Sequence, residues 1–163
     1  MAQEDSIYLG NPLLKKANVK QEFTEKQVIE FIKCKKDPVY FAKNYIKIVS
    51  LDEGLTQFHP YDFQEKLIRN FHEHRFNICK MPRQTGKSTT SVSYLLHYAV
   101  FNDSTNIGIL ANKAATARDL LGRLQIAYEN LPKWMQQGII SWNKGSLELE
   151  NGSKILAAST SAS

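Results

Sequence analysis

The chain has 163 residues, of which 42% are hydrophobic and 23% are charged. This balance excludes a largely disordered polypeptide and is enough for one domain with its own hydrophobic core. Lysine and arginine total 21 against 16 aspartates and glutamates, which gives a net charge of +5. A basic surface suits a polyanionic partner such as nucleic acid, although a solvated basic face gives the same composition.

The cysteines and histidines argue against a zinc site. Cys34 and Cys79 are far apart in the sequence, and the four histidines are scattered. Two thiols in a chain of this length suit a reducing compartment. There is no run of 18 apolar residues, and the first ten residues are too polar for a signal peptide. We therefore expect a soluble, cytosolic protein with no membrane segment.

The first half of the chain is predicted to be mainly helical. Residues 1–22 show little periodicity and are predicted to form a polar arm. Residues 23–75 are predicted to form a helical subregion, with helices over 24–36, 37–49 and 61–71.

Local signals support these three helices. Thr24 is followed three residues later by Gln27, the pattern of a capping box. Asp37 can cap the second helix, with Pro38 in its first turn, where a missing N–H does no harm. The third helix has one face at helical spacing, formed by Gln64, Leu67, Ile68 and Phe71.

Residues 76–163 have the pattern of an α/β core. Strands are predicted over 75–81 and 105–111, the second buried on both faces, and a helix is predicted over 88–101 with another after the second strand. The alternation predicts a parallel sheet. The core faces of the two helices are formed by Val92, Leu95, Leu96, Ala99 and Val100, and by Ala117, Leu120, Leu121, Leu124, Tyr128 and Leu131.

The sequence "GSLELENGSKILA" predicts a hairpin. A three-residue loop at 150–152, closed by a glycine bulge, pairs Leu147 with Ile155 and Glu148 with Lys154. A two-residue Asn-Gly loop would instead place Glu148 opposite Ile155 and shift every pair. We favour the three-residue loop.

Residues 81–88, "MPRQTGKS", are called the GKS loop below. They end like the phosphate-binding pattern G-x-x-x-x-G-K-[ST], but Met81 stands where the first glycine belongs. A loop between a strand and a helix presents backbone N–H groups to a phosphate, and Pro82 can enforce its turn. Lys87 would reach the β- and γ-phosphates and Ser88 would bind Mg²⁺, while a Cβ at Gly86 would crowd the loop.

Arg83 has two interpretations of equal weight. It could stabilise charge on the γ-phosphate as an arginine finger in cis. It could equally form a salt bridge from the loop to the sheet edge. The residue type alone does not decide between them.

The sequence "PRQTGKST" resembles the deviant phosphate-binding loop of large terminase subunits, the DNA-packaging motors of tailed double-stranded DNA phages. In that family an Arg-Gln pair precedes x-G-K-[ST], and the first glycine is commonly missing. The segments "DPVYFAKNY", "DFQ", "GILANK" and "GIISWNKGSLELENGS" resemble the contractile-tailed group. The resemblance runs from about residue 8 to the end.

This resemblance implies a fold and a set of site residues. The fold would be a P-loop NTPase of the RecA/helicase-like type, with an N-terminal helical subregion. Gln64 matches the adenine-recognising glutamine and Phe63 a neighbouring aromatic, for which we favour helix packing. Asn112 and Lys113 match a helicase-like motif after the second strand, and we expect Lys113 to face solvent. The implied nucleotide-binding residues are Gln64, Arg83, Gln84, Thr85, Gly86, Lys87, Ser88 and Thr89, with Arg83 and Lys87 catalytic and Ser88 at the metal.

The resemblance also implies the cofactors and partners. ATP and Mg²⁺ would drive double-stranded DNA into a procapsid, with the portal protein and a small terminase subunit as partners. The motor would work as an oligomeric ring in the host cytoplasm, transiently at the portal vertex of the procapsid. Two other functions stay open, a DNA helicase-like ATPase and a non-catalytic nucleotide- or DNA-binding fragment.

An ATP motor also needs an apolar strand that ends in acidic residues. Asp52 and Glu53 in "IKIVSLDEG" precede the GKS loop, whereas that strand should follow it, so we interpret them as a turn. We expect the acidic strand and the family's nuclease domain beyond Ser163. The chain by itself is therefore expected to bind nucleotide weakly at most and not to hydrolyse it.

Overall fold

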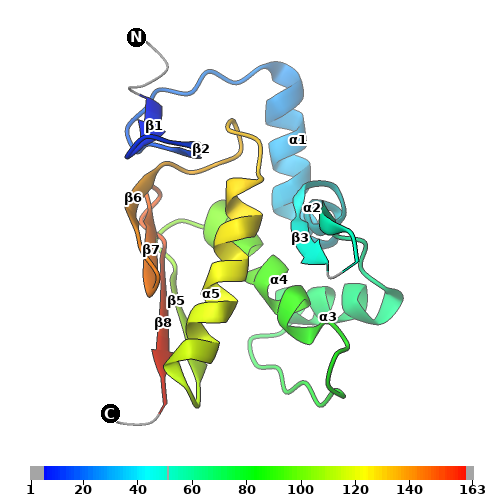
Figure 1. Ribbon diagram of the computed structural model, residues 1–163. Helices are drawn as coiled ribbons and strands as arrows, with labels where there is room; N and C mark the ends of the chain where they lie inside the picture. Colours follow the sequence, from blue (N-terminus) through cyan, green and yellow to red (C-terminus); the bar gives the residue numbers. More distant parts are fainter. Residues whose placement is uncertain (1–5, 51, 161–163) are drawn as a thin grey trace.

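The computed structural model describes residues 6–50 and 52–160 (Figure 1). The described helices are α1 (Glu25–Lys36), α2 (Pro38–Tyr45), α3 (Asp62–Glu73), α4 (Lys87–Phe101) and α5 (Ala114–Glu129). The described strands are β1 (Ile7–Tyr8), β2 (Asn11–Lys15), β3 (Lys47–Ser50), β4 (Gly54–Gln57), β5 (Asn106–Ala111), β6 (Ile139–Trp142), β7 (Ser146–Leu149) and β8 (Lys154–Ser159).

A mixed four-stranded sheet has the strand order β5-β8-β7-β6. β5 and β8 are parallel, while β7 pairs antiparallel with both β8 and β6. The α/β class is therefore confirmed, but the sheet is mixed and not parallel as predicted, since only β5 and β8 pair in parallel. The reason is the β7–β8 hairpin, because a tight hairpin loop can join only antiparallel strands.

The hairpin itself has the predicted register. Leu147 pairs with Ile155 and Glu148 pairs with Lys154, and Gly152 has a φ of 82°. A positive φ at this position is what a three-residue hairpin loop with a glycine bulge requires. The two-residue alternative is excluded.

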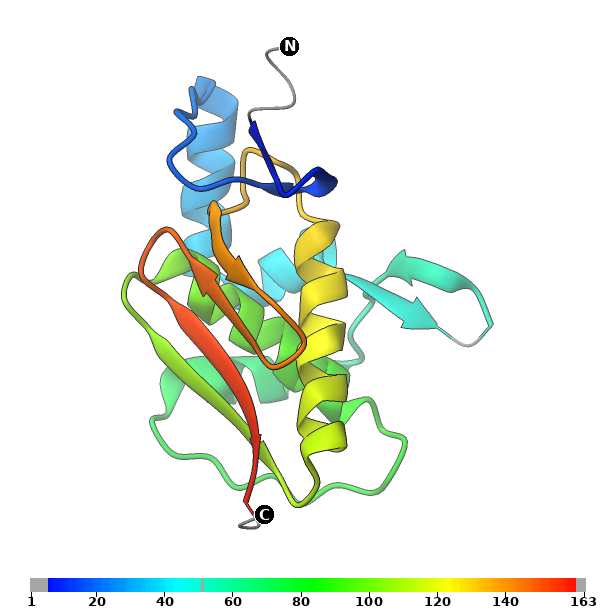
Figure 2. The same ribbon diagram turned by 60° about the vertical axis from the view of Figure 1, so that its left-hand side comes forward.

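Helices cover one face of this sheet, and the other face has no helical cover among the described residues. α5 packs on β5 and β8 and also against α4, and α1, α2 and α3 lie on the far side of α4 from the sheet (Figures 1 and 2). Ile109 on the covered face is buried, whereas Leu110 on the other face is 64% exposed. The prediction that β5 is buried on both faces was therefore wrong for the described chain.

The core is largest where α4 meets the N-terminal helices. Phe101 near the end of α4 lies 4.9 Å from Phe31 of α1 and 5.2 Å from Phe41 of α2, measured between ring centroids in edge-on arrangements. Such aromatic contacts add to the free energy gained from burying the rings. They fix α4, and therefore the loop before it, against the helical subregion.

The predicted caps of the first two helices are confirmed. The Thr24 hydroxyl accepts a hydrogen bond from the Gln27 N–H, and the Gln27 side chain accepts one from the Thr24 N–H. One Asp37 carboxylate oxygen accepts from the N–H groups of Val39 and Tyr40. Both helices therefore begin where local sequence predicts.

The second helix ends earlier than predicted. α2 stops at Tyr45, and the residues after it form β3, which pairs antiparallel with β4. The Gln57 amide donates to the carbonyls of Lys43 and Ile46, so the hairpin closes the end of the helix. Three β-branched residues, Ile46, Ile48 and Val49, favour a strand here once this partner is present.

The predicted strand at 75–81 is absent. These residues have no regular structure, and the Ile78 side chain is 100% exposed. A short apolar run forms a strand only where another strand can accept and donate its backbone hydrogen bonds, and no described strand lies beside it. The segment instead joins α3 to α4 as a long loop, at the bottom of Figure 1.

The N-terminal arm contains a short hairpin that the sequence did not reveal. β1 pairs with β2, and Leu14 of β2 is 1% exposed. The Gln136 side chain accepts from the Lys15 N–H and donates to the Leu13 carbonyl, which holds β2 against the segment after α5. Leu13 beside it is 49% exposed and the next residue, Lys15, is charged, so this segment shows no clear periodicity and only the packing shows that the arm is docked.

Candidate functional site

The GKS loop has a specialised backbone. Gln84 has a φ of 61° and Gly86 a φ of 72°, both in the left-handed region, which is strained for any residue with a Cβ. The Thr85 hydroxyl donates to the Pro82 carbonyl over 3.1 Å and tightens the turn. Gly86 is the N-cap of α4. The first N–H groups of α4 therefore face the loop without intrahelical partners.

Buried Thr90 joins the loop to α4. Its side chain is fully buried, and its hydroxyl donates to the Gly86 carbonyl over 2.9 Å. The Thr90 N–H donates to the same carbonyl over 2.9 Å. Gly86 is thus held from the helix side by two hydrogen bonds.

Gln64 of α3 contacts the loop from the other side. Its side chain is 4% exposed, its oxygen accepts from the Tyr61 N–H over 2.9 Å, and its nitrogen donates to the Thr85 carbonyl over 3.1 Å. The structure therefore brings together Gln64 and the GKS loop, which are 21 residues apart in sequence.

The charged and hydroxyl groups of the loop differ in exposure. Lys87 is half-buried, and its ammonium donates to the Met81 carbonyl over 3.3 Å. Ser88 and Thr89 are also half-buried at the start of α4. Arg83 is exposed and pairs with no carboxylate in the described part of the chain. Lys87 closes the loop onto the residue that replaces the first glycine.

A hollow of about 330 Å³ lies between the loop, the start of α3 and the β3–β4 hairpin. Gln64, Gly86 and Thr89 line one side of it, and Asp52 and Glu53 line the other. These two acidic residues form the turn between β3 and β4, as predicted. The sequence did not show that the turn folds back to this hollow.

Tyr61 lines this hollow, and its ring stacks on that of Phe63. The Tyr61 and Phe63 rings are nearly parallel, with centroids 5.8 Å apart and an interplanar angle of 11°. They are 70% and 46% exposed, so Phe63 is only partly used in helix packing. Sequence reasoning missed Tyr61, although an aromatic two residues before Phe63 was a usable signal.

A second hollow of about 570 Å³ lies on the other side of the β3–β4 hairpin. Gln84 and Thr89 line it from the loop side, and Asp119 and Arg123 line it from α5. Arg123 and Asp119 form an ion pair at 3.0 Å. Figure 2 shows the hairpin standing out from the body of the molecule. Residues of the hairpin, including Ile48, line both hollows.

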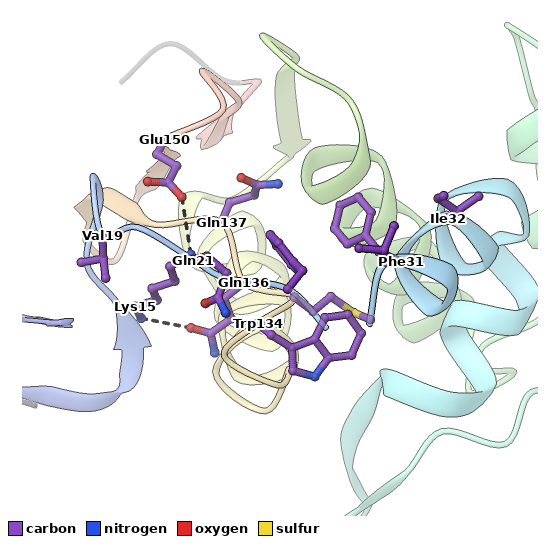
Figure 3. Close-up of a pocket in the computed structure, with 12 residues that line it drawn as sticks. Lys15, Val19, Gln21, Phe31, Ile32, Trp134, Gln136, Gln137 and Glu150 are labelled. Atoms are coloured by element: carbon purple, nitrogen blue, oxygen red, sulfur yellow. Dashed lines mark hydrogen bonds and ion pairs between the residues drawn. The ribbon is translucent and has the colours of Figure 1, made fainter. Parts of the chain in front are cut away.

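A third hollow, of about 510 Å³, lies between the arm, α1 and the segment after α5 (Figure 3). No residue of the GKS loop lines it. Its charged side chains, Lys15 and Glu150, already have protein partners. The Lys15 ammonium lies 3.9 Å from a Glu150 carboxylate oxygen, and Glu150 accepts from the N–H groups of Asn18 and Gly138. We interpret this hollow as part of the surface on which the N-terminal arm packs, and not as a ligand site.

The second predicted motif lies at the end of β5. Lys113 is exposed, as expected, and is the N-cap of α5, while Asn112 precedes it. Within residues 6–50 and 52–160, no group of three or more His, Cys, Asp or Glu side chains could hold a metal ion. None of the described helices is long and apolar enough to cross a membrane.

Fold and site together define an α/β protein in which a loop with left-handed backbone at Gln84 and Gly86 leads directly into the N-terminus of α4. A family model described as the N-terminal part of the terminase large subunit, T4likevirus-type, matches residues 78–163. The match covers slightly more than half of the chain and includes the whole GKS loop, α4, α5 and the whole mixed sheet. The chain belongs to this family, and its role lies in bacteriophage genome packaging, with DNA and packaging components as partners.

Proposed function

We propose that this chain is the nucleotide-binding part of an ATP-driven packaging motor with a P-loop NTPase fold. The observation that carries the proposal is the GKS loop, whose left-handed Gly86 opens α4 and aims the first N–H groups of the helix at the loop. A helix N-terminus of this kind attracts phosphate through its free N–H groups and its dipole. The basic side chain of Lys87 at the same place adds a full positive charge.

The residues of the loop suit the phosphates of ATP. Lys87 would leave the Met81 carbonyl for the β- and γ-phosphates, and Ser88 would hold Mg²⁺ beside them. Arg83 is exposed and pairs with no acid among residues 6–50 and 52–160, so it could turn toward the γ-phosphate. Mg²⁺, when bound, would neutralise charge that develops on the phosphates.

The base would enter the hollow beside Gln64. Tyr61 lines this hollow and Thr89 lines it on the loop side, while Gln84 and Thr85 would complete the nucleotide site within the loop. Adenine is the expected base, since the remaining donor and acceptor capacity of Gln64 suits its edge. ATP hydrolysis in the motor would drive double-stranded DNA into the procapsid, with the portal protein and a small terminase subunit as partners.

Removing the Lys87 ammonium tests this proposal. We expect Lys87→Ala to weaken Mg-ATP binding to the chain by roughly 10- to 100-fold, because a charge-assisted contact to phosphate contributes about 1.5–3 kcal/mol. Isothermal titration calorimetry measures the affinity, and the thermal unfolding midpoint checks that the variant folds.

Lys113→Ala is the matched control, since Lys113 is a lysine at the start of the other buried helix. It should bind Mg-ATP as the unsubstituted chain does. Equal affinity of the Lys87→Ala variant and the unsubstituted chain would contradict the proposed site.

A further inference from the structure

We propose that Gln64 is a positioning residue for the GKS loop, and that it sets the affinity for phosphate independently of any base. This inference rests on the proposed function, namely that the loop binds the phosphates of a nucleotide. It differs from a role in base recognition alone, because the contact that carries it is made to the backbone of the loop.

The hydrogen bonds of the Gln64 amide show how it is used. A glutamine side chain has two N–H donors and an oxygen with two lone pairs. The oxygen already accepts from the Tyr61 N–H, and the nitrogen already donates to the Thr85 carbonyl. Half of the capacity of this buried amide therefore joins the first turn of α3 to the loop.

The bond to Thr85 fixes the direction of a backbone donor. A peptide unit is planar and trans, so the Thr85 carbonyl and the Gly86 N–H point in opposite directions. Because the carbonyl points toward Gln64, the Gly86 N–H points to the side of the loop away from α3. Glycine is the residue with the most conformational freedom, so this peptide unit needs an external contact to keep one orientation.

The close approach of Gln64 also explains the glycine at position 86. A Cβ added to Gly86 would lie 2.3 Å from the Gln64 side-chain nitrogen, and the next nearest atom would be the Gln64 amide carbon at 3.6 Å. Gly86 is therefore required by its φ of 72° and, separately, by the side chain that bonds to the preceding carbonyl. Gln64 and Gly86 act as one unit.

A ligand without a base separates positioning from base recognition. Calorimetry would compare Mg-ATP with Mg-tripolyphosphate for the unsubstituted chain, Gln64→Ala and Gln64→Glu. We expect Gln64→Ala to weaken both ligands by the same factor, about tenfold, since one backbone donor is no longer held toward the phosphate. Gln64→Glu keeps an oxygen for the Tyr61 N–H but, as a carboxylate, has no donor for the Thr85 carbonyl. Its affinity for both ligands should therefore fall at least as far as that of Gln64→Ala.

Phe63→Ala is the matched control. It removes the ring that stacks on Tyr61 from the same turn of α3 and keeps Gln64, whose amide bonds to Thr85. Its affinity for Mg-tripolyphosphate should equal that of the unsubstituted chain. If Gln64→Ala weakens Mg-ATP and leaves Mg-tripolyphosphate unchanged, Gln64 acts on the base alone and the inference is wrong, while the proposed function stands.

A ligand-free measurement tests the same contact. Gly86→Ala should lower the urea midpoint of unfolding by more in the unsubstituted chain than in a Gln64→Ala background, where the crowded amide is gone. Equal losses in the two backgrounds would overturn the coupling of Gln64 to Gly86. If the unsubstituted chain binds neither ligand, the proposed function fails and this inference fails with it.

Discussion

The chain twice places an apolar run, a loop and a helix in succession, at residues 75–101 and at residues 105–129, and the two regions fold differently. In the second region β5 pairs in parallel with β8 over six residues, and Ile109 is 6% exposed. In the first region the apolar run has no pairing, and Ile78 is fully exposed. The comparison teaches that an apolar run becomes a strand only when a neighbouring strand completes its hydrogen bonds.

The loops before α4 and α5 also differ, but here the first region has the more unusual backbone. α5 starts in an ordinary way, with Lys113 in extended backbone (φ −124°, ψ 135°). α4 starts from a left-handed Gly86, which Thr90 and Gln64 hold from two sides. Backbone strain persists only where surrounding contacts enforce it, and it concentrates at functional positions. The first region, whose apolar run forms no strand, therefore has the loop with the left-handed backbone and the supporting contacts.

Each helix also buries one polar ring that donates to a distant carbonyl. In α4 the His97 ring nitrogen Nε2 lies 2.9 Å from the Cys34 carbonyl of α1. In α5 the Tyr128 hydroxyl donates to the Gln137 carbonyl. In acid a histidine ring takes up a proton and a phenol does not, so lowering the pH should distinguish the two helices.

The largest expected effect is a loss of folding stability in acid that is caused by the buried His97 ring. The pKa of His97 is lowered from 6.5 to about 4, mainly by burial and to a lesser extent by nearby His72, although the hydrogen bond to Cys34 and the charge of Asp37 oppose the shift. The unfolded chain therefore binds a proton below pH 6.5 that the folded chain does not bind until about pH 4. The free energy of unfolding should fall by about 3 kcal/mol as pH drops through this range.

Urea unfolding between pH 7 and pH 4 measures this loss. His97→Gln should remove about 3 kcal/mol of the pH dependence, whatever its stability at pH 7. His74→Gln, which changes an exposed ring, should keep the dependence. A pH dependence equal in the His97→Gln variant and the unsubstituted chain would contradict the burial of a neutral histidine in α4.

A smaller and pH-independent effect is expected in α5. Tyr128→Phe removes the donor to the Gln137 carbonyl but keeps the buried ring, which should lower the free energy of unfolding by about 1 kcal/mol. Burial raises the pKa of Tyr128 well above its ordinary value, so the phenol stays neutral. Urea unfolding at pH 7 and pH 5 should give the same difference from the unsubstituted chain. A difference that changes between these pH values would refute this account.

The smallest effect should have the opposite sign. Gly122 lies inside α5, and a Cβ added there would meet no atom within 4 Å. Gly122→Ala should therefore raise the free energy of unfolding by up to about 1 kcal/mol, because alanine is the better helix former. Gly86→Ala is the comparison and should lower it. Thermal and urea unfolding give the sign, and a loss of stability in Gly122→Ala would show a close contact in α5.

Much of the fold could be predicted because the signals are local. The capping box of Thr24 and Gln27, the Asp37 cap and the Leu147–Ile155 register are all confirmed. The segments that failed depend on contacts far away in sequence. The stretch after Tyr45 became a strand because β4 pairs with it, and Leu14 is buried because the segment after α5 covers it. The division of the chain at residues 22 and 75 stays a prediction.

The sequence by itself determined the family and the chemistry available at the GKS loop, because these reside in residue types at fixed spacing. It also determined where α4 and α5 run, since their apolar residues recur with the helical period. Only the tertiary structure decided that Gln64 bonds to Thr85 and that Asp52 and Glu53 line the hollow beside Gln64 and Gly86. It also decided that residues 75–81 pair with no described strand. These outcomes depend on which surfaces meet after the helices pack, and local sequence does not contain that information.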